Sequence, residues 1–386
     1  MLKRGVLLIG FLSTFSLSLA QHHEAAAETK PATETKVVSA KEAEKEQIKK
    51  ENKEFIDHHL LDAHSFDIMV EKKADGTEHH IGFPLPVIFY DEANGLHAFM
   101  SSEFHHGKEM KDAHGKKYNV VESKGANYAL YHEKIVKTDA SGAITLDDHG
   151  HTTNDKVWDF SITKSVLMIL CASLLMIVIF GSMARNYKKS PIPTGAGKLF
   201  EPLVIFIRDE IAIPNIGPKY HKYISYLLTI FFFILFLNVF GLLPFGINVT
   251  GNLAITAALA IFTFIITQFT ANRNYWQHIF WMPGLPFLMK LVMIPIELIG
   301  MIIKPFALLI RLFANMSAGH IVIFSLIAMI YYFQNVIAGV AFPFLTFVLY
   351  LLEILVAFLQ AYIFTMLSAV YFGMANEEHH HEEAHH

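Results

Sequence analysis

Apolar runs of about 20 residues recur through the second half of the sequence, and they constrain the fold more than any other feature. The hydrocarbon core of a bilayer is roughly 30 Å thick, which about 20 residues of α-helix can cross. We therefore predict an α-helical multispanning membrane domain over residues 161–375. About five transmembrane helices are expected, the first three at 165–184, 224–243 and 253–270.

The last apolar stretch is too long for one ordinary span. As a single helix, residues 285–333 would extend on the order of 70 Å, more than twice the thickness of the hydrocarbon core. Pro286, Pro295 and Pro305 should kink or break such a helix. The stretch is therefore either divided into two spans or steeply tilted, and the polar residues at 333–339 mark a turn into the last helix.

The N-terminal half has a different composition. Residues 1–160 hold 45 of the Lys, Arg, Asp and Glu residues, whereas residues 161–386 hold 21. Residues 1–20 have the pattern of a secretory signal, with Lys3 and Arg4 before an apolar core and small residues at its end. A short uncleaved anchor is the alternative. The net charge of −4 averages these unlike regions and says little about partners.

A linker and a small module follow the signal. Residues 21–54 are polar and poor in aromatics, as linkers are. Over residues 55–160, short alternating or aromatic runs are separated by turn sequences such as EANG and DASGA. This pattern indicates a small β-rich module. Residues 376–386 form a polar tail of His and Glu.

Basic residues indicate the orientation in the membrane. Seven Lys or Arg lie between residues 185 and 223, whereas the loops near 244–252 and 332–340 have none. The positive-inside rule places the basic connection in the cytoplasm, which agrees with an exported N-terminus. We expect a multi-pass protein of the bacterial inner membrane, with a periplasmic mature N-terminus and a cytoplasmic C-terminus.

Histidine is concentrated in the linker and module, which hold 14 of the 22 histidines. Asp147, His149 and His151 would share one face of an extended segment, and such side chains can bind zinc and related metals. No ligand set recurs at a defined spacing, so we interpret these histidines as solvated and predict neither a metal site nor a cofactor. The single Cys171 provides neither a disulfide framework nor a cysteine metal cluster.

Arg311 lies within the long apolar stretch, where an arginine costs about 2.5–3.5 kcal/mol on insertion scales. Glu297, Lys304 and Arg311 recur every seven residues, which keeps them in a narrow stripe of one helix, and Asn315 lies one turn further. Ionisable groups at membrane depth usually mark an ion pathway. Because arginine keeps its proton, Arg311 cannot relay one, but it can favour the ionised form of a carboxylate beside it.

Two polar pairs specify nearly the same register for an antiparallel hairpin. Pairing Arg311 with Gln360 centres the turn between residues 335 and 336, and pairing His320 with Glu353 centres it between 336 and 337. His320 and Glu353 are therefore expected to form a buried acid–base pair. A purely structural hydrogen bond between the helices is the alternative.

The segment KPFALLIRLFANMSAGH, residues 304–320, closely resembles the signature of subunit a of F-type ATP synthases, and LLEILVAFLQAYIFTMLSAVYFGMA, residues 351–375, resembles the last helix of that family. The resemblance covers roughly residues 160–375 and excludes the N-terminal module. It implies two long, tilted helices that form a hairpin against a rotating c-ring.

By this resemblance the chain is a non-catalytic stator subunit that conducts protons through two half-channels and couples their flow to ring rotation and ATP synthesis. The implied partners are the c-ring, subunit b and the remaining ATP synthase subunits, in contact with lipid and without nucleic acid. The proton-path positions that match are Arg311, His320, Glu353, Gln360, Asn315, Glu297 and Asn238.

One departure from the family concerns the outer entrance of the path. Gly241 and Gly246 stand where some members have aspartates, so other groups must serve there, such as Asn248, Asn252 or histidines of the module.

An alternative function is a stand-alone cation or metal transporter with a histidine-rich periplasmic sensor domain. It predicts paired ligands within the spans, where His320 and Glu353 are the one obvious pair. The sequence lacks the GxxxxGK[ST] motif, so nucleotide chemistry would belong to partner subunits.

Overall fold

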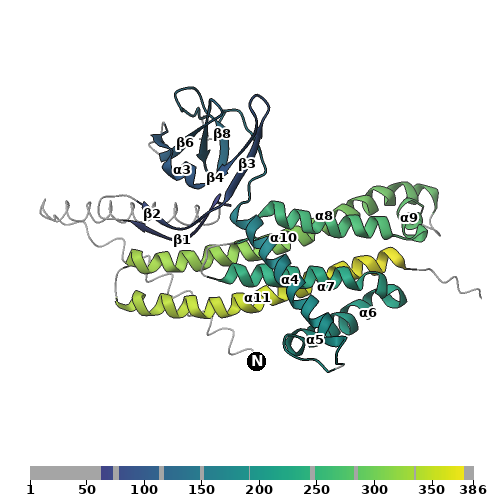
Figure 1. The fold of residues 1–386 in the computed structure, drawn as a ribbon. Helices are drawn as coiled ribbons and strands as arrows, with labels where there is room; N and C mark the ends of the chain where they lie inside the picture. The colour runs from purple at the N-terminus through teal and green to yellow at the C-terminus, as the bar shows by residue number, and fades with distance from the viewer. Residues whose placement is uncertain are drawn as a thin grey trace, which may run out of the picture. The chain divides into compact units, whose positions relative to one another are not determined.

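The structure is a computed structural model of the 386-residue chain. It describes residues 62–72, 78–112, 117–147, 152–190, 192–243, 248–281, 286–333 and 336–377. The expected signal, the linker and nearly all of the His/Glu tail lie outside the described residues. Along the chain, strands come first and helices follow, as the colours of Figure 1 show.

The β-rich part begins soon after residue 62. Its described strands are β1 (Ser65–Lys72), β2 (Glu78–Pro84), β3 (Pro86–Asp91), β4 (Gly95–Met100), β5 (Lys108–Lys111), β6 (Lys117–Ser123), β7 (Ala126–Tyr131), β8 (Lys134–Lys137) and β9 (Trp158–Asp159). They form antiparallel sheets in the orders β1-β2, β4-β3-β9 and β5-β6-β7-β8. The predicted β-rich module is thus confirmed, although the short helix α3 (Ser102–His106) was not expected.

Tight turns join the strands of this module. The EANG turn between β3 and β4 ends at Gly95, whose φ of 77° suits glycine. Lys124 and Gly125 connect β6 to β7 with φ values of 50° and 81°. His132 and Glu133 connect β7 to β8 at 49° and 57°, a pair without glycine that the sequence did not reveal as a turn.

The core of the module lies between two of its sheets. Val87 and Phe89 of β3 are fully buried and cluster with Val121, Tyr128 and Ile135 of the four-stranded sheet. Because successive side chains of a strand point to opposite faces, each of these sheets also has a second face. On the four-stranded sheet that second face carries Tyr118, Val120, Ala129, Tyr131 and Val136, with Ile144 and Leu146 packed against it.

Five described helices are long and apolar enough to cross a membrane, as predicted. They are α4 (Lys164–Tyr187), α7 (Ile224–Leu242), α8 (Leu253–Thr270), α10 (Phe287–Phe333) and α11 (Val336–Asn376). Between α4 and α7 lie α5 (Gly197–Phe206), the π-helix η1 (Ile207–Ala212), α6 (Ile213–Ile216) and the 3₁₀-helix η2 (Gly217–Lys222). The short helix α9 (Arg273–Phe280) precedes α10.

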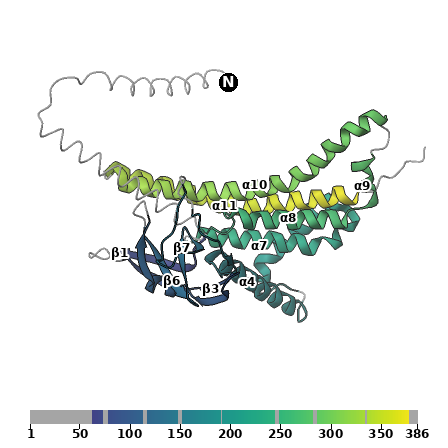
Figure 2. The ribbon, with the colours of Figure 1, turned by 90° about the horizontal axis from the view of Figure 1, so that it is seen from above.

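Helix α10 is continuous over 47 residues, although it contains Pro295 and Pro305. Of the two alternatives that the sequence left open for this stretch, the single long helix is therefore confirmed, and the prolines do not break it. The helix bends along its length in Figure 2. A full break would leave backbone groups unpaired within lipid, which favours bending over interruption. Helix α10 ends at Phe333 and α11 begins at Val336, both within the segment 333–339 where the sequence predicted the change of helix.

Helix α11 packs against its neighbours through small residues. Ala357, Ala361 and Ala369 are at most 1% exposed and belong to its inward face. At Gly373 an added Cβ would lie 1.9 Å from the backbone oxygen of Asn215 in α6, so the two backbones approach very closely. Helices within membranes commonly associate through such small residues. Figures 1 and 2 show α10 running alongside α11, and the two are in extensive contact.

Candidate functional site

His320 of α10 and Glu353 of α11 face each other across the hairpin. Their Nδ1 and Oε1 atoms are 3.1 Å apart, and the residues are 8% and 5% exposed. The structure therefore brings together the acid–base pair that the sequence predicted, in the predicted antiparallel register.

His320 also bonds to two backbone carbonyls. Its Nδ1 is 3.0 Å from the oxygen of Met316, and its Nε2 is 3.0 Å from the oxygen of Gly241 at the end of α7. A neutral imidazole has one N–H, so only the protonated ring can donate to both oxygens. Oε1 of Glu353 accepts no hydrogen bond from the described residues, and its contact with His320 is an ion pair when the imidazole is protonated.

Gly319 makes room for this pair. A Cβ at position 319 would lie 2.6 Å from Oε1 of Glu353 and 3.2 Å from its Cδ. The absence of a side chain thus lets the carboxylate lie against α10 beside His320. The sequence interpretation did not single out Gly319, because its role depends on the neighbouring helix.

Asn238 connects α7 to α11 near the pair. This fully buried side chain donates from Nδ2 to the oxygen of Ala357 at 3.1 Å and accepts at Oδ1 from the hydroxyl of Thr250 at 2.9 Å. The hydroxyl of Tyr350 donates to the backbone oxygen of Leu242 at the end of α7. The polar groups of these elements therefore converge on one region of the hairpin.

The segment before α8 contributes further polar contacts. Asn248 donates from Nδ2 to the oxygen of Met316 at 3.3 Å, the same carbonyl that His320 approaches. Asn252 instead caps α8, accepting from the backbone N–H of Ala254 at 2.9 Å. Of the two asparagines considered for the outer entrance, Asn248 is thus the one beside His320. Gly246 lies outside the described residues.

Arg311 and Asn315 lie on an exposed face of α10. The inward face instead carries Leu308, Leu312, Met316 and His320, spaced four residues apart. Within the described part of the chain Arg311 forms no hydrogen bond or ion pair, so the structure does not join it to Gln360. Gln360 itself is 3% exposed on the inward side of α11.

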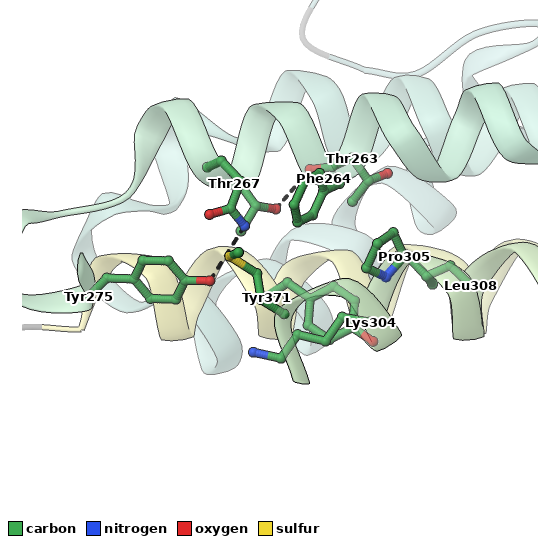
Figure 3. Close-up of a pocket in the computed structure, with 10 residues that line it drawn as sticks. Thr263, Phe264, Thr267, Tyr275, Lys304, Pro305, Leu308 and Tyr371 are labelled. Atoms are coloured by element: carbon green, nitrogen blue, oxygen red, sulfur yellow. Dashed lines mark hydrogen bonds between the residues drawn. The ribbon is translucent and has the colours of Figure 1, made fainter. Parts of the chain in front are cut away.

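Glu297 and Lys304 lie half-buried toward the N-terminal end of α10. Lys304 lines a small cavity of about 10 Å³ between α8, α9, α10 and α11, and its Nζ is 5.8 Å from the ring centre of Tyr371. Figure 3 shows how Thr263, Thr267 and Tyr275 line the same cavity. A volume of that size suits about one water molecule.

Polar side chains of α8 contribute to this cavity. Gln268 donates to the hydroxyl of Tyr275 at 3.4 Å, and its Oε1 accepts no hydrogen bond from the described residues. The sequence interpretation missed this group. The sequence feature that could have revealed this group is the recurrence of threonine along one side of an apolar helix, at the buried positions Thr256, Thr263 and Thr267.

Two buried histidines, His64 and His97, lie in the described part of the module, and His64 is the one near the point where the chain enters α4. Nε2 of His64 is 2.9 Å from Oδ2 of Asp159, and its Nδ1 is 3.7 Å from Oε2 of Glu133. Burial alone would lower the pKa of His64, but the two carboxylates outweigh it and raise the pKa to about 9. The adjacent Asp62 accepts hydrogen bonds from the Thr163 hydroxyl and the Ser165 N–H at the start of α4.

The sequence also contains His, Asp and Glu side chains that could bind a metal ion. Among the described residues, no group of three or more His, Cys, Asp and Glu side chains is arranged to hold a metal ion. His149 and His151 lie outside these residues, so the face expected for Asp147, His149 and His151 is not described.

Comparison with known proteins adds two family matches. Residues 166–373 match the model of the family described as ATP synthase A chain. Residues 55–160 match a domain of unknown function, DUF8433, which corresponds to the β-rich module.

Individual relatives agree with the first match. The chain is 48% identical over 228 residues to ATP synthase subunit a 2 of Chlorobaculum tepidum, covering 56% of this chain and 64% of that relative. It is 39% identical over 325 residues to ATP synthase subunit a of Chlorobium phaeobacteroides, covering 79% and 93%. The Myxococcus xanthus protein of the same name is 44% identical over 239 residues, covering 60% and 78%.

The family match spans more than half of the chain and coincides with the five apolar helices. This multi-pass membrane protein therefore belongs to the family of ATP synthase subunit a.

Proposed function

We propose that this chain is the proton-conducting stator subunit of the membrane sector of a bacterial F-type ATP synthase. In this role it is non-catalytic, contacts the c-ring and subunit b, and couples proton flow to ring rotation and ATP synthesis. Family membership supports the assignment, and the observation that carries it is the exposed Arg311, which has no hydrogen bond or ion pair among the described residues.

Arg311 needs a counter-charge, and none of the residues that the structure describes supplies one. An unpaired guanidinium at membrane depth is costly, and the exposed face of α10 leaves it available to another subunit. A carboxylate of the c-ring would meet that need. Because arginine favours the ionised form of a neighbouring carboxylate, the ring carboxylate would release its proton on approaching Arg311.

Polar groups on the two sides of Arg311 would serve the two half-channels. His320 is nine residues beyond Arg311 on α10, about 14 Å along the axis, and Glu297 and Lys304 are about 21 and 10 Å in the other direction. If the N-terminus is periplasmic and all five apolar helices span the membrane, His320 and Glu353 would belong to the periplasmic half, and Lys304 to the cytoplasmic half.

The outer half-channel would use the polar groups around His320. Asn238 and Asn248 hold the end of α7 and the following segment against the hairpin, and His320 with Glu353 offers a buried group that can exchange a proton. An imidazole suits this task because its ordinary pKa lies near physiological pH. Asn315 and Gln360 would make the region around Arg311 polar.

The proposal is tested with inverted membrane vesicles that pump protons when ATP is added. Arg311→Ala should abolish ATP-driven acidification while the complex stays assembled, because the ring carboxylate then lacks the group that ionises it. The matched control is Arg208→Ala, since Arg208 is exposed, lies outside the spans and pairs with its neighbour Asp209. Coupled pumping by assembled Arg311→Ala complexes would contradict the proposal.

The partners are tested by native purification of the full chain. The c-ring and subunit b should copurify with it in a constant ratio. Purification of the chain as a separate transporter, with ion transport of its own, would favour the alternative function.

A further inference from the structure

The outer face of the β4-β3-β9 sheet, directed away from the module core, is apolar and exposed. Tyr90 is paired with Leu96 on one side and with Trp158 on the other, so these three side chains share a face. Extending the same alternation along the strands defines the outer face by nine residues: Leu96, Tyr90 and Trp158; Ala98, Ile88 and Phe160; Met100, Pro86 and Ile162.

Hydrogen bonds extend the third strand beyond Asp159. The N–H of Phe160 donates to the oxygen of Ile88 at 2.8 Å, and that of Ile162 donates to the oxygen of Pro86 at 3.0 Å. Residues 158–162 therefore run alongside β3 in one register, and the chain then enters α4 at Lys164.

This face departs from the usual pattern of a sheet with one side in the core. Such antiparallel sheets alternate apolar residues inward with polar residues outward. Here the inward side carries Val87 and Phe89 of the core together with buried Asp91 and His97, whereas the outer face contains no charged residue at all. Trp158 is 63% exposed, Phe160 65% and Leu96 57%. A contiguous exposed patch of this kind marks an interaction site.

The position of the face in the chain identifies the partner. Ile162 is two residues before Lys164, the first residue of a membrane-spanning helix. The start of that helix is held to the module, since the Lys164 N–H donates to the oxygen of Ala63 at 3.0 Å and the Ser165 N–H to Asp62 at 3.1 Å. At about 3.3 Å per residue, even Trp158 is within roughly 20 Å of the span.

We propose that the outer face of the β4-β3-β9 sheet is a lipid-contacting surface that lies on the headgroup region of the bilayer. Trp and Tyr are enriched at this depth because their rings are amphipathic, and apolar side chains between them gain from burial there. A protein partner would instead be expected to meet hydrogen-bonding groups, which the nine side chains supply only through Tyr90 and Trp158. The inference rests on α4 being a span and does not depend on proton conduction.

The test uses the full chain in lipid nanodiscs, in a Cys171→Ser background with one new cysteine labelled by an environment-sensitive fluorophore. Trp158→Cys, Phe160→Cys and Leu96→Cys place the probe on the outer face from two different strands. Lys117→Cys is the control, because Lys117 is 62% exposed and lies on β6 of the four-stranded sheet. At the three outer-face positions we expect blue-shifted emission and quenching by lipids carrying a shallow nitroxide, both absent at position 117.

Three results would overturn the proposal. The first is quenching of the outer-face probes by aqueous iodide without quenching by lipid. The second is a blue shift that arises only in the assembled complex, which would identify a protein partner. The third is a shift that depends on protein concentration, which would identify a second copy of the chain. Because the three cysteines lie at separate positions, a folding defect in one leaves the other two as tests.

Discussion

Nδ1 of His320 and Oε1 of Glu353, 33 residues apart in the sequence, lie 3.1 Å apart across the α10–α11 hairpin. Both side chains are largely buried, so neither of them could be solvated by water if it were charged. The contact also fixes the register of two helices whose apolar surfaces would tolerate several alignments. These two residues should therefore behave as one coupled unit.

A residue exchange tests this coupling. His320→Glu alone places two carboxylates together, and Glu353→His alone places two imidazoles together, so each should reduce proton conduction. The double exchange restores one group of each kind. We expect it to conduct more than either single variant in ATP-driven pumping, which gives a favourable interaction in a double-mutant cycle.

An independent measurement tests the same proximity. Cysteines at positions 320 and 353, in a Cys171→Ser background, should be joined by a short crosslinking reagent. Additive losses in the double exchange, together with no crosslink, would show that the two residues are not neighbours in the membrane.

Gly319→Ala tests the space beside the pair. The new Cβ would lie 2.6 Å from Oε1 of Glu353, so the flexible carboxylate must move away from His320. We expect assembled complexes with several-fold slower proton pumping. Gly300→Ala is the control on the same helix, since a Cβ there meets nothing within 4 Å. Equal pumping by the two variants would contradict the close approach of α11 at Gly319.

Arg311→Lys separates charge from geometry at the exposed face of α10. Lysine keeps a positive charge, but its ammonium is a compact, strongly hydrated point charge without the planar fork of arginine. We therefore expect most coupled pumping to be lost while the subunit is still inserted and assembled. Near-normal pumping by Arg311→Lys would mean that any cation suffices at this position.

The helices and the hairpin register could be predicted because the sequence carries a simple signal for each: the length of an apolar run for a helix, and one polar pair for the register. Hydrophobic length alone gave the first three spans within a few residues of α4, α7 and α8. His320 and Glu353 could be paired because two polar residues in an apolar hairpin have few alternatives. The prolines left two outcomes open, a kink or a break, and the sequence alone could not decide between them, because the outcome depends on the need to keep backbone groups paired within lipid.

The rest of the site depends on contacts that no local pattern encodes. The carbonyls of Gly241 and Met316 accept from His320 through their backbone, which every residue possesses. Gly319 is indistinguishable in sequence from other helix glycines, because what sets it apart is a carboxylate on another helix. The turn at His132 and Glu133 was likewise hidden, since it lacks the glycine or asparagine that usually marks such turns.

Gly373→Ala should disrupt the packing of α11 against α6. Its Cβ would lie 1.9 Å from the backbone oxygen of Asn215, which cannot rotate away as a side chain can. Gly339→Ala, on the same helix, meets nothing within 4 Å and should be neutral or stabilising by up to about 1 kcal/mol, because alanine favours helix. We expect a lower melting temperature in detergent and less subunit in membranes for Gly373→Ala alone. Equal stability of the two would refute the close contact.

His64 should make the attachment of the module to α4 sensitive to alkaline pH. Its pKa is raised from 6.5 to about 9 in the folded chain, so its stabilising effect is complete below pH 6.5 and is lost as the pH rises through 9. A rise of this size corresponds to roughly 3 kcal/mol. The protection factors of the Ile162 and Lys164 amides, which bond to Pro86 and Ala63, report on this junction.

Hydrogen–deuterium exchange of the full chain in nanodiscs measures those protection factors. They should be constant from pH 5.5 to about 6.5 and fall between about pH 7 and 10, after correction for intrinsic exchange. Asp159→Asn removes the carboxylate nearest to His64, so the protonated imidazole is stabilised less and the pKa of His64 should be lower. The fall in the protection factors should therefore begin at lower pH. Glu109→Gln, which removes an exposed carboxylate paired with Lys117, should leave the profile unchanged. A wild-type profile that is flat across this range, or one that Asp159→Asn does not alter, would show that His64 does not carry the charge that holds this junction.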